Sequence, residues 1–153
     1  MVYLLFQLGR ERYALEAQSI VEVLPMVLIT PIPQAPAGIV GAFNYRGTPV
    51  PAIDLSWLAM GRPARNRLST RLILVNYPDA AGHPHRLGLV AEKATDLVRR
   101  EPAEFVDAGV TNDRAPYLGP VAADASGIIQ LIEATKLLSP EVRAALFRTA
   151  AEC

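Results

Sequence analysis

Residues 39–55 read IVGAFNYRGTPVPAIDL, and this stretch decides the fold. Two apolar runs flank a short polar segment that ends in glycine. The spacing predicts two strands joined by a tight turn, with Asn44 and Gly47 supplying the positive φ values that such turns need. Pro49 and Pro51 lack a backbone N–H, so we expect the second strand to lie at a sheet edge.

Outward from this hairpin, short apolar runs bounded by turn residues recur along the chain. They predict nine or ten strands, among them 2–8, 13–15, 20–24, 39–43, 50–55, 72–75, 87–90, 96–99 and 127–132. Proline excludes regular structure from 25 to 36, and residues 101–117 are expected to be irregular. Helix signals occur twice, over 56–60 and after Ser139-Pro140-Glu141. This pattern is typical of small barrels or a sandwich.

A faint internal repeat relates the two halves of the chain. Residues 15–23 align with residues 89–97 at an offset of 74. Ile53-Asp54-x-x-x-Leu58 aligns with Ile132-Glu133-x-x-x-Leu137 at an offset of 79. The repeat favours two similar small barrels, divided near residues 62–70, over one large barrel.

Composition narrows the class of protein. The 153 residues carry 15 Lys and Arg against 15 Asp and Glu, and 51% are hydrophobic. This balance excludes a mostly disordered chain and argues against a nucleic-acid binder, which needs a basic excess. Arg62, Arg65, Arg67 and Arg71 are interpreted as belonging to a solvated loop. We expect a cytoplasmic protein, because no apolar run is long enough to cross a membrane and no signal peptide is recognised.

The sequence contains few residue patterns that indicate catalysis or metal binding. The sequence has no nucleophile elbow, phosphate-binding loop or dinucleotide fingerprint. Asp79, His83 and His85 make at most an incomplete zinc site and are interpreted as a solvated loop. The single cysteine, Cys153, has no disulfide partner. We therefore expect no metal, no cofactor and no bound nucleotide.

The amount of apolar sequence is itself informative, because two small barrels have limited interiors. We expect apolar side chains to stay exposed in the proline-rich segment 25–36 and around Tyr45. Exposed apolar patches mark partner surfaces, and edge strands that carry proline remain available for specific docking. The sequence therefore predicts a protein-binding module.

Several segments, in their order along the chain, resemble one family. They are Phe6-x-Leu8-Gly9-x-x-x-Tyr13-Ala14-Leu15, Ile20-Val21-Glu22-Val23, Ile39-x-Gly41-x-x-Asn44-Tyr45-Arg46-Gly47, Val50-Pro51-x-Ile53-Asp54-Leu55, Gly88-Leu89-Val90 through Asp96-Leu97-Val98, Tyr117-Leu118-Gly119, and Gly127-Ile128-Ile129 to Leu137-Leu138. Together they resemble the CheW-like domain, the coupling protein family of bacterial chemosensory arrays.

The resemblance implies one mostly β domain over residues 1–153. Its expected architecture is two intertwined SH3-like five-stranded β-barrels with short helices and a C-terminal helix. We expect the first barrel mainly over 10–65, the second mainly over 66–138 and the helix over 139–150.

The resemblance also implies a function without catalysis. Relatives bridge the cytoplasmic tip of a methyl-accepting chemoreceptor to the regulatory domain of a CheA-type histidine kinase, with no membrane insertion and no nucleic acid. By position in the matching segments, the resemblance assigns a set of receptor-binding or kinase-binding residues: Ile20, Glu22, Gly41, Asn44, Tyr45, Arg46, Gly47, Leu89, Glu92 and Val98. Arg46 matches the family's turn arginine, whereas Tyr45 stands where many relatives carry leucine.

Other functions stay open at this point. Within the family, the alternatives are a regulator of a pilus, surface-sensing or developmental pathway and a variant that inhibits the kinase. Outside the family, the distant alternatives are a small-barrel enzyme and a small-barrel nucleic-acid binder. The neutral charge and the absence of an aromatic stacking pattern argue against the nucleic-acid binder.

Overall fold

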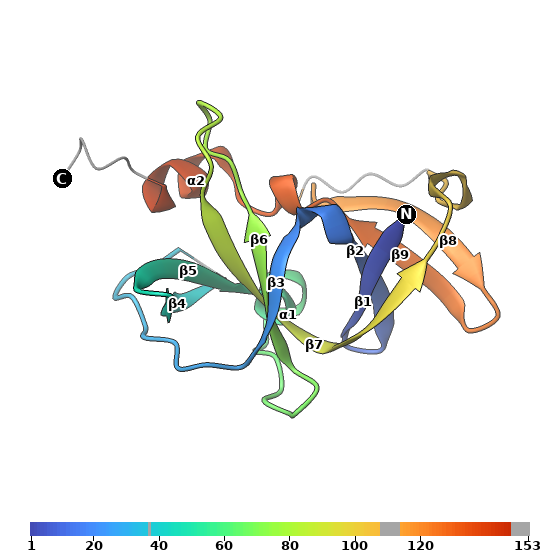
Figure 1. The fold of residues 1–153 in the computed structure, drawn as a ribbon, viewed down its shortest axis with the longest axis horizontal. Coiled ribbons are helices and arrows are strands. Elements are labelled where there is room, and N and C mark those ends of the chain that lie inside the picture. Colours follow the sequence, from blue (N-terminus) through green and yellow to red (C-terminus); the bar gives the residue numbers. More distant parts are fainter. Residues whose placement is uncertain (37, 108–113, 148–153) are drawn as a thin grey trace.

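The computed structural model describes residues 1–36, 38–107 and 114–147, which form a mostly β fold as expected (Figure 1). The strands are β1 (Val2–Leu8), β2 (Glu11–Glu16), β3 (Ile20–Pro25), β4 (Ile39–Tyr45), β5 (Thr48–Asp54), β6 (Arg71–Asn76), β7 (Arg86–Arg99), β8 (Leu118–Asp124) and β9 (Gly127–Ile132). The helices are α1 (Leu55–Met60) and α2 (Pro140–Leu146), with 3₁₀ turns η1 (Ala17–Ser19), η2 (Pro102–Glu104) and η3 (Ala134–Lys136).

The strands form one continuous sheet that curls into two lobes. The central lobe has the strand order β3-β6-β7-β5-β4 and comes from the middle of the chain. The terminal lobe has the order β7-β1-β2-β9-β8 and comes from both ends. Each lobe has five strands because β7, 14 residues long, belongs to both (Figure 1).

The two lobes agree with the intertwined five-stranded barrels that the resemblance implied, although the hydrogen-bonded sheet closes in neither lobe. The strands are divided differently from the expected barrels over 10–65 and 66–138. In the structure β2 belongs to the terminal lobe, and β6 belongs to the central lobe. Each lobe therefore draws strands from both halves of the chain.

A bend in β7 allows one strand to serve both lobes. The first half of β7 pairs with β6 and the second half pairs with β1, whose register shifts between Leu5 and Gln7. At the bend, Lys93 has a φ of 51°, a left-handed conformation that is uncommon for a residue with a side chain. The sequence predicts two strands here, 87–90 and 96–99, whereas the structure has one bent strand.

The strand pairing confirms the internal repeat. Ala14 of β2 pairs in parallel with Leu131 of β9. Gly88 of β7 pairs in parallel with Ala52 of β5. The two pairs are related by the offsets of 74 from β2 to β7 and 79 from β5 to β9 that the sequence shows.

Three hydrophobic clusters stabilise the fold, and the largest, the shared core, contains residues from both lobes and from the end of α2. Its buried members are Leu4, Phe6, Leu8, Leu15, Ile39, Ile53, Leu55, Ile73, Val75, Tyr77, Leu87, Leu89, Ala91, Ala94, Tyr117, Ile132, Ala134, Leu137, Leu138 and Phe147. Alternate residues of a strand point to opposite faces. In β6, Ile73 therefore joins the shared core while Leu72 fills the central lobe. In β1, Leu4 joins the shared core while Tyr3 fills the terminal lobe.

Both helices begin at a capping side chain, of which the sequence analysis indicates only Ser139. Asp54 caps α1 by accepting two backbone N–H bonds, and Ser139 caps α2 by accepting one. The structure describes α2 as far as Leu146, and the last residues of the predicted helix over 139–150 lie outside the described residues. Among the described residues, no helix is long and apolar enough to cross a membrane.

One strand was missed by sequence reasoning. In the described parts of 101–117 the structure is irregular apart from η2, as predicted, and residues 108–113 lie outside the described residues; β8 then begins at Leu118 without having been expected. Gly119 and Pro120 interrupt the apolar alternation of β8, and the register against β9 shifts in this part of the strand. The signal for β8 is therefore its pairing with β9 and not its own sequence pattern.

The terminal lobe contains an ion-pair network that links strands far apart in the sequence. Asp124, at the end of β8, accepts two hydrogen bonds from the Arg12 guanidinium, at 2.5 and 3.0 Å, and one from Arg100 at 3.1 Å. The Arg12 hydrogen bond is the main cause that lowers the pKa of Asp124 to about 2. An aspartate whose pKa is lower in the folded state stabilises the fold above its ordinary pKa and loses that contribution as the pH falls.

We predict that Asp124→Asn flattens the acid limb of the stability curve. Between about pH 5 and about pH 2, the wild-type free energy of unfolding should fall more steeply than that of the variant, because only the wild type protonates this carboxylate. Urea unfolding across this pH range measures the difference. Asp96→Asn, which removes an exposed carboxylate without an ion pair in the described residues, should keep the wild-type slope. Equal slopes for wild type and Asp124→Asn would contradict the prediction.

Candidate partner-binding surface

The outer strands of the central lobe are joined by side chains from the expected partner-binding set. β3 and β4 stand at opposite ends of the strand order. The Glu22 Oε1 atom in β3 accepts a hydrogen bond of 2.8 Å from the Tyr45 hydroxyl at the end of β4. The same oxygen accepts a longer bond of 3.4 Å from the Arg46 guanidinium. We name Glu22, Tyr45 and Arg46 the clasp.

The turn beside the clasp differs from the sequence expectation. The positive φ values belong to Arg46, at 52°, and Gly47, at 87°, and not to Asn44. Asn44 lies in β4 and acts through its side chain, whose Oδ1 accepts the Gly47 N–H at 2.7 Å. Two-residue hairpin turns of type I′ need positive φ at both central positions, which here are Arg46 and Gly47. A residue with a side chain pays about 1 kcal/mol for the left-handed conformation, so Arg46 occupies a position that glycine would fill with less strain.

The clasp orients a cation that faces solvent. The Arg46 side chain is 77% exposed, and its guanidinium lies over the Tyr45 ring at 5.1 Å from the ring centre. The hydrogen bond to Glu22 raises the pKa of the Tyr45 hydroxyl above its ordinary value. Glu22 and the tyrosine ring both contact the guanidinium group of Arg46 itself. Most of the guanidinium remains available to a partner.

Gly41 serves the backbone in this structure. Its φ is 148°, and it adjoins a two-bond bridge in which Thr30 and Ala42 exchange N–H···O bonds of 2.8 and 2.9 Å. A Cβ at Gly41 would collide with the carbonyl oxygen of Thr30. The bridge and the clasp together connect β3 and the segment after it to β4.

The other residues of the expected set are dispersed. Ile20 is half-buried in β3 against the shared core. Leu89 is fully buried in that core, so its side chain does not reach the surface. Val98 packs beside the smaller core of the terminal lobe. Glu92 lies at the bend of β7, where it accepts a 3.4 Å hydrogen bond from Ser56. The structure thus gathers the residues of the turn with Glu22 and separates the rest.

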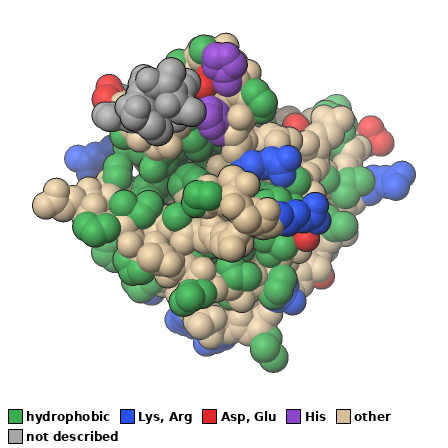
Figure 2. Space-filling view, turned by 60° about the vertical axis from the view of Figure 1, so that its left-hand side comes forward, with side chains coloured by type: hydrophobic (Ala, Val, Ile, Leu, Met, Phe, Trp, Pro, Cys, Tyr) green, Lys and Arg blue, Asp and Glu red, His purple; other side chains and the backbone are tan. Residues whose placement is uncertain are grey.

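Exposed apolar side chains accompany the clasp, as the sequence predicts for segment 25–36. Leu28 is 87% exposed, and Val27 and Ile32 are also exposed. Figure 2 shows hydrophobic side chains spread over the face that it views. Sequence reasoning did not single out the exposed Leu97 and Ile128 of the terminal lobe. Leu97 stands in an alternating run, which shows the strand but not which face is covered.

The histidine loop is largely exposed, as the sequence suggests, and Asp79 joins its two histidines. Asp79 contacts His85 Nε2 at 2.9 Å and His83 Nδ1 at 3.4 Å. The His85 hydrogen bond is the main cause that lowers the pKa of Asp79 to about 2, and the His85 ring stacks on Phe147 at 4.6 Å. Among the described residues, no cluster of three such side chains can hold a metal ion, and Cys153 lies outside those residues.

Comparisons with known proteins agree on one family. The family model of the CheW-like domain matches residues 2–142. Protein FrzA of Myxococcus xanthus is 29% identical over 146 residues, which cover 94% of this chain and 88% of that protein. The chemotaxis protein CheW of Treponema pallidum is 25% identical over 140 residues, covering 88% and 79%. The crystal structure of the scaffolding protein TtCheW from Thermoanaerobacter tengcongensis superposes with a TM-score of 0.77 at 26% identity, covering 90% of this chain and 87% of that one.

We predict that Gly41→Ala destabilises the fold by about 2 kcal/mol or more, because backbone atoms of Thr30 occupy the space that the new methyl group needs. Gly82→Ala is the matched control, since Gly82 has a φ of 85° with open space around its missing Cβ. The control should lose only the roughly 1 kcal/mol of left-handed strain. Urea unfolding compares the two variants, and equal losses would show that the Thr30 bridge does not constrain position 41.

Proposed function

The chain belongs to the CheW-like domain family of chemotaxis scaffold proteins, and from this premise we propose that it couples the cytoplasmic tips of chemoreceptors to a CheA-type histidine kinase. In this role it acts as a non-catalytic adaptor in the cytoplasm, recruited to receptor arrays at the membrane. Its contribution is to fix the relative geometry of receptor and kinase, so that a change in receptor conformation biases kinase activity.

The observation that carries this proposal is the exposed, oriented arginine of the clasp. A hairpin tip does not need a long cation in order to fold, and Arg46 adopts a strained backbone conformation there. Its planar guanidinium suits carboxylates or backbone carbonyls at the end of a helical receptor tip. Glu22 and Tyr45 contact the guanidinium itself, yet the Arg46 side chain remains 77% exposed. We assign to Arg46 the direct contact with the partner. We assign to Glu22 and Tyr45 the role of orienting the Arg46 guanidinium.

The remaining members of the expected set receive narrower roles. Asn44, Gly41 and Gly47 shape the turn and its approach. Ile20 and Val98 are half-buried and can contribute only part of their side chains to an interface, while Leu89 acts through the shared core. The contact to receptor or kinase is thus proposed at the clasp and its exposed apolar neighbours.

A second candidate within the family is a regulator that inhibits the kinase, or one that serves a pathway other than flagellar chemotaxis. The surface of the clasp is compatible with both outputs, because binding and activation are separate properties. A kinase assay with receptor, kinase and this protein together distinguishes them. Kinase activity that rises with added protein supports coupling, and activity that falls supports inhibition.

We predict that Arg46→Ala weakens binding to the receptor tip or to the kinase regulatory domain by about thirtyfold, which corresponds to roughly 2 kcal/mol. Arg46→Glu should weaken binding further, since it adds repulsion to the lost contact. The free energy of unfolding of Arg46→Ala should change by less than about 0.5 kcal/mol, because alanine keeps the same strained backbone and the side chain is exposed. Titration calorimetry and thermal melting on the same preparations measure both quantities.

Arg99→Ala, which removes an exposed arginine of β7 outside the clasp, is the control and should leave partner binding within about twofold. Glu22→Gln tests the orienting role, because it keeps an acceptor for Tyr45 but removes the charge beside Arg46. It should weaken binding less than Arg46→Ala does. Binding that survives Arg46→Glu unchanged would remove the clasp from the interface, and equal effects of Glu22→Gln and Arg46→Ala would make the clasp a structural element only.

A further inference from the structure

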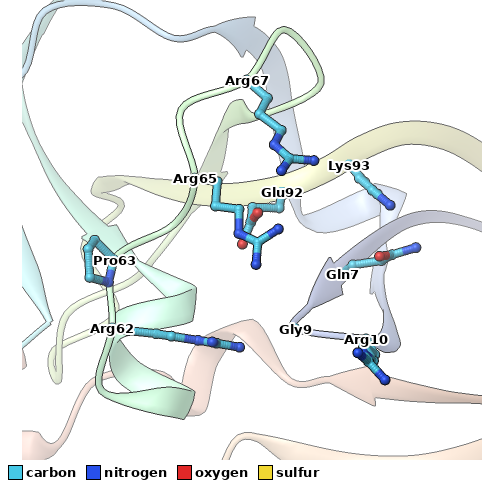
Figure 3. A pocket seen from close by; sticks show the side chains of 9 residues that line it. All are labelled: Gln7, Gly9, Arg10, Arg62, Pro63, Arg65, Arg67, Glu92 and Lys93. Carbon is cyan, nitrogen blue, oxygen red and sulfur yellow. The ribbon is translucent and has the colours of Figure 1, made fainter.

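A hollow in the described surface lies away from the clasp, where the two lobes meet. Its volume is about 580 Å³, and three separate elements line it. These are the β1–β2 turn with Arg10, the loop between α1 and β6, and the bend of β7 with Glu92 and Lys93. Figure 3 shows Arg62, Arg65 and Arg67 reaching from the α1–β6 loop on one side, with Lys93 and Arg10 on the other.

The charge of this pocket contrasts with that of the whole chain. Five cations, Arg10, Arg62, Arg65, Arg67 and Lys93, surround a single carboxylate, Glu92, which gives a formal charge of +4. The whole chain has a formal net charge of zero. The five side chains lie on a protein with 15 acidic residues, yet no ion pair joins any of them to a carboxylate within the described ranges.

Some cations elsewhere in the described residues have an ion pair, and others without one, such as Arg86 and Arg99, lie outside the pocket. Arg12 and Arg100 contact Asp124, and Lys136 contacts Glu133. Like charges held together repel one another and disfavour the compact state unless a counter-charge is present. The convergence of five such cations on one pocket therefore marks a place where a counter-charge from outside the chain would relieve the repulsion.

The α1–β6 loop is fixed in place and does not simply project into solvent. The backbone N–H of Ala64 donates a 2.8 Å hydrogen bond to the buried carboxylate of Asp54. At the other end of the loop, the buried hydroxyl of Thr70 donates to the Arg65 carbonyl and accepts from the Arg67 N–H at 3.2 Å. The bases of the loop arginines are thus anchored, which lowers the entropy that binding would cost.

We propose that this pocket binds a small anion that carries two or more phosphate groups. Guanidinium groups present paired N–H donors that match phosphate oxygens, and four of the five cations are arginines. The volume lies in the range of small-molecule sites. Cations that converge from three sides suit a compact, multiply charged ligand better than an extended acidic peptide. Glu92 then accepts a hydrogen bond from a hydroxyl or amino group of a ligand that carries one.

This site is independent of the coupling role, since it uses none of the residues of the clasp. Binding of a phosphorylated small molecule at the junction of the lobes would let the adaptor respond to that molecule directly, independently of the receptor. The chemistry fits inorganic polyphosphate and nucleoside polyphosphates alike, so the test includes one of each.

Isothermal titration calorimetry with tripolyphosphate, ATP and inorganic phosphate on the full chain tests the proposal. We expect tripolyphosphate to bind at one site at least about tenfold more tightly than inorganic phosphate. Affinity should fall as the salt concentration rises from about 0.05 to about 0.2 M, because the contacts are between exposed charges. ATP that binds more tightly than tripolyphosphate identifies a nucleotide as the source, and the reverse order identifies inorganic polyphosphate.

Two variants with equal net charge separate the pocket from general charge attraction. Arg62→Gln with Arg65→Gln should weaken tripolyphosphate binding at least about tenfold. Arg86→Gln with Arg99→Gln, which removes two exposed arginines outside the pocket, should change it by less than about twofold. Thermal melting checks that both variants are folded. Equal weakening in the two variants, no measurable tripolyphosphate binding, or tighter binding of a poly-glutamate peptide than of tripolyphosphate would each overturn the proposal.

Discussion

Burial of the inner strands on both faces is the constraint on which the rest of the structure depends. β1 and β6 each contribute alternate residues to the shared core and to the interior of one lobe. Fully burying one large aliphatic side chain stabilises a fold by about 1.5–3 kcal/mol, and the shared core collects such side chains from both lobes and from Phe147 after α2. Neither lobe can be separated from the other without exposing this core. The bend of β7 and the position of the pocket at the junction follow from that arrangement.

Much of the fold could be predicted from sequence, because strands buried on both faces leave continuous apolar runs with clear ends. The two strands of the hairpin over 39–55 and the repeat offsets were correct for this reason, although β5 pairs with both β4 and β7 and is not the expected edge strand. The strands that sequence reasoning missed or divided wrongly are those that are defined by the strands they pair with. β8 lacks a pattern of its own, and β7 is one strand only because both halves pair on either side of a left-handed lysine. Membership in a lobe is likewise a matter of pairing and not of position along the chain.

For the candidate partner-binding surface too, the sequence indicated which residues take part but not how residues distant in sequence come together. Glu22 and the turn residues were found by resemblance, and the structure brings Glu22, Tyr45 and Arg46 together. The sequence could not show that Arg46 itself carries the positive φ, because Asn44 satisfies the turn through its side chain instead. It also could not show that Arg62, Arg65 and Arg67 line a pocket, because Arg10 and Lys93 reach that pocket from elements distant in sequence. A solvated loop was the natural reading of that segment in isolation.

The parallel pairing of β2 with β9 has a consequence for synthesis on the ribosome. The β1–β2 hairpin is synthesised before the other strands of the sheet. The outer edge of β2 stays unpaired until β9 is synthesised, because Arg12 of β2 pairs with Ile129 of β9. All strands of the central lobe emerge earlier, by the end of β7. The central lobe can therefore assemble during translation. The apolar β1–β2 hairpin is synthesised before it, yet its pairing in the sheet is completed last. Long-range parallel pairing is slow, and exposed apolar strands aggregate, so this hairpin is the segment of the nascent chain most dependent on protection by chaperones.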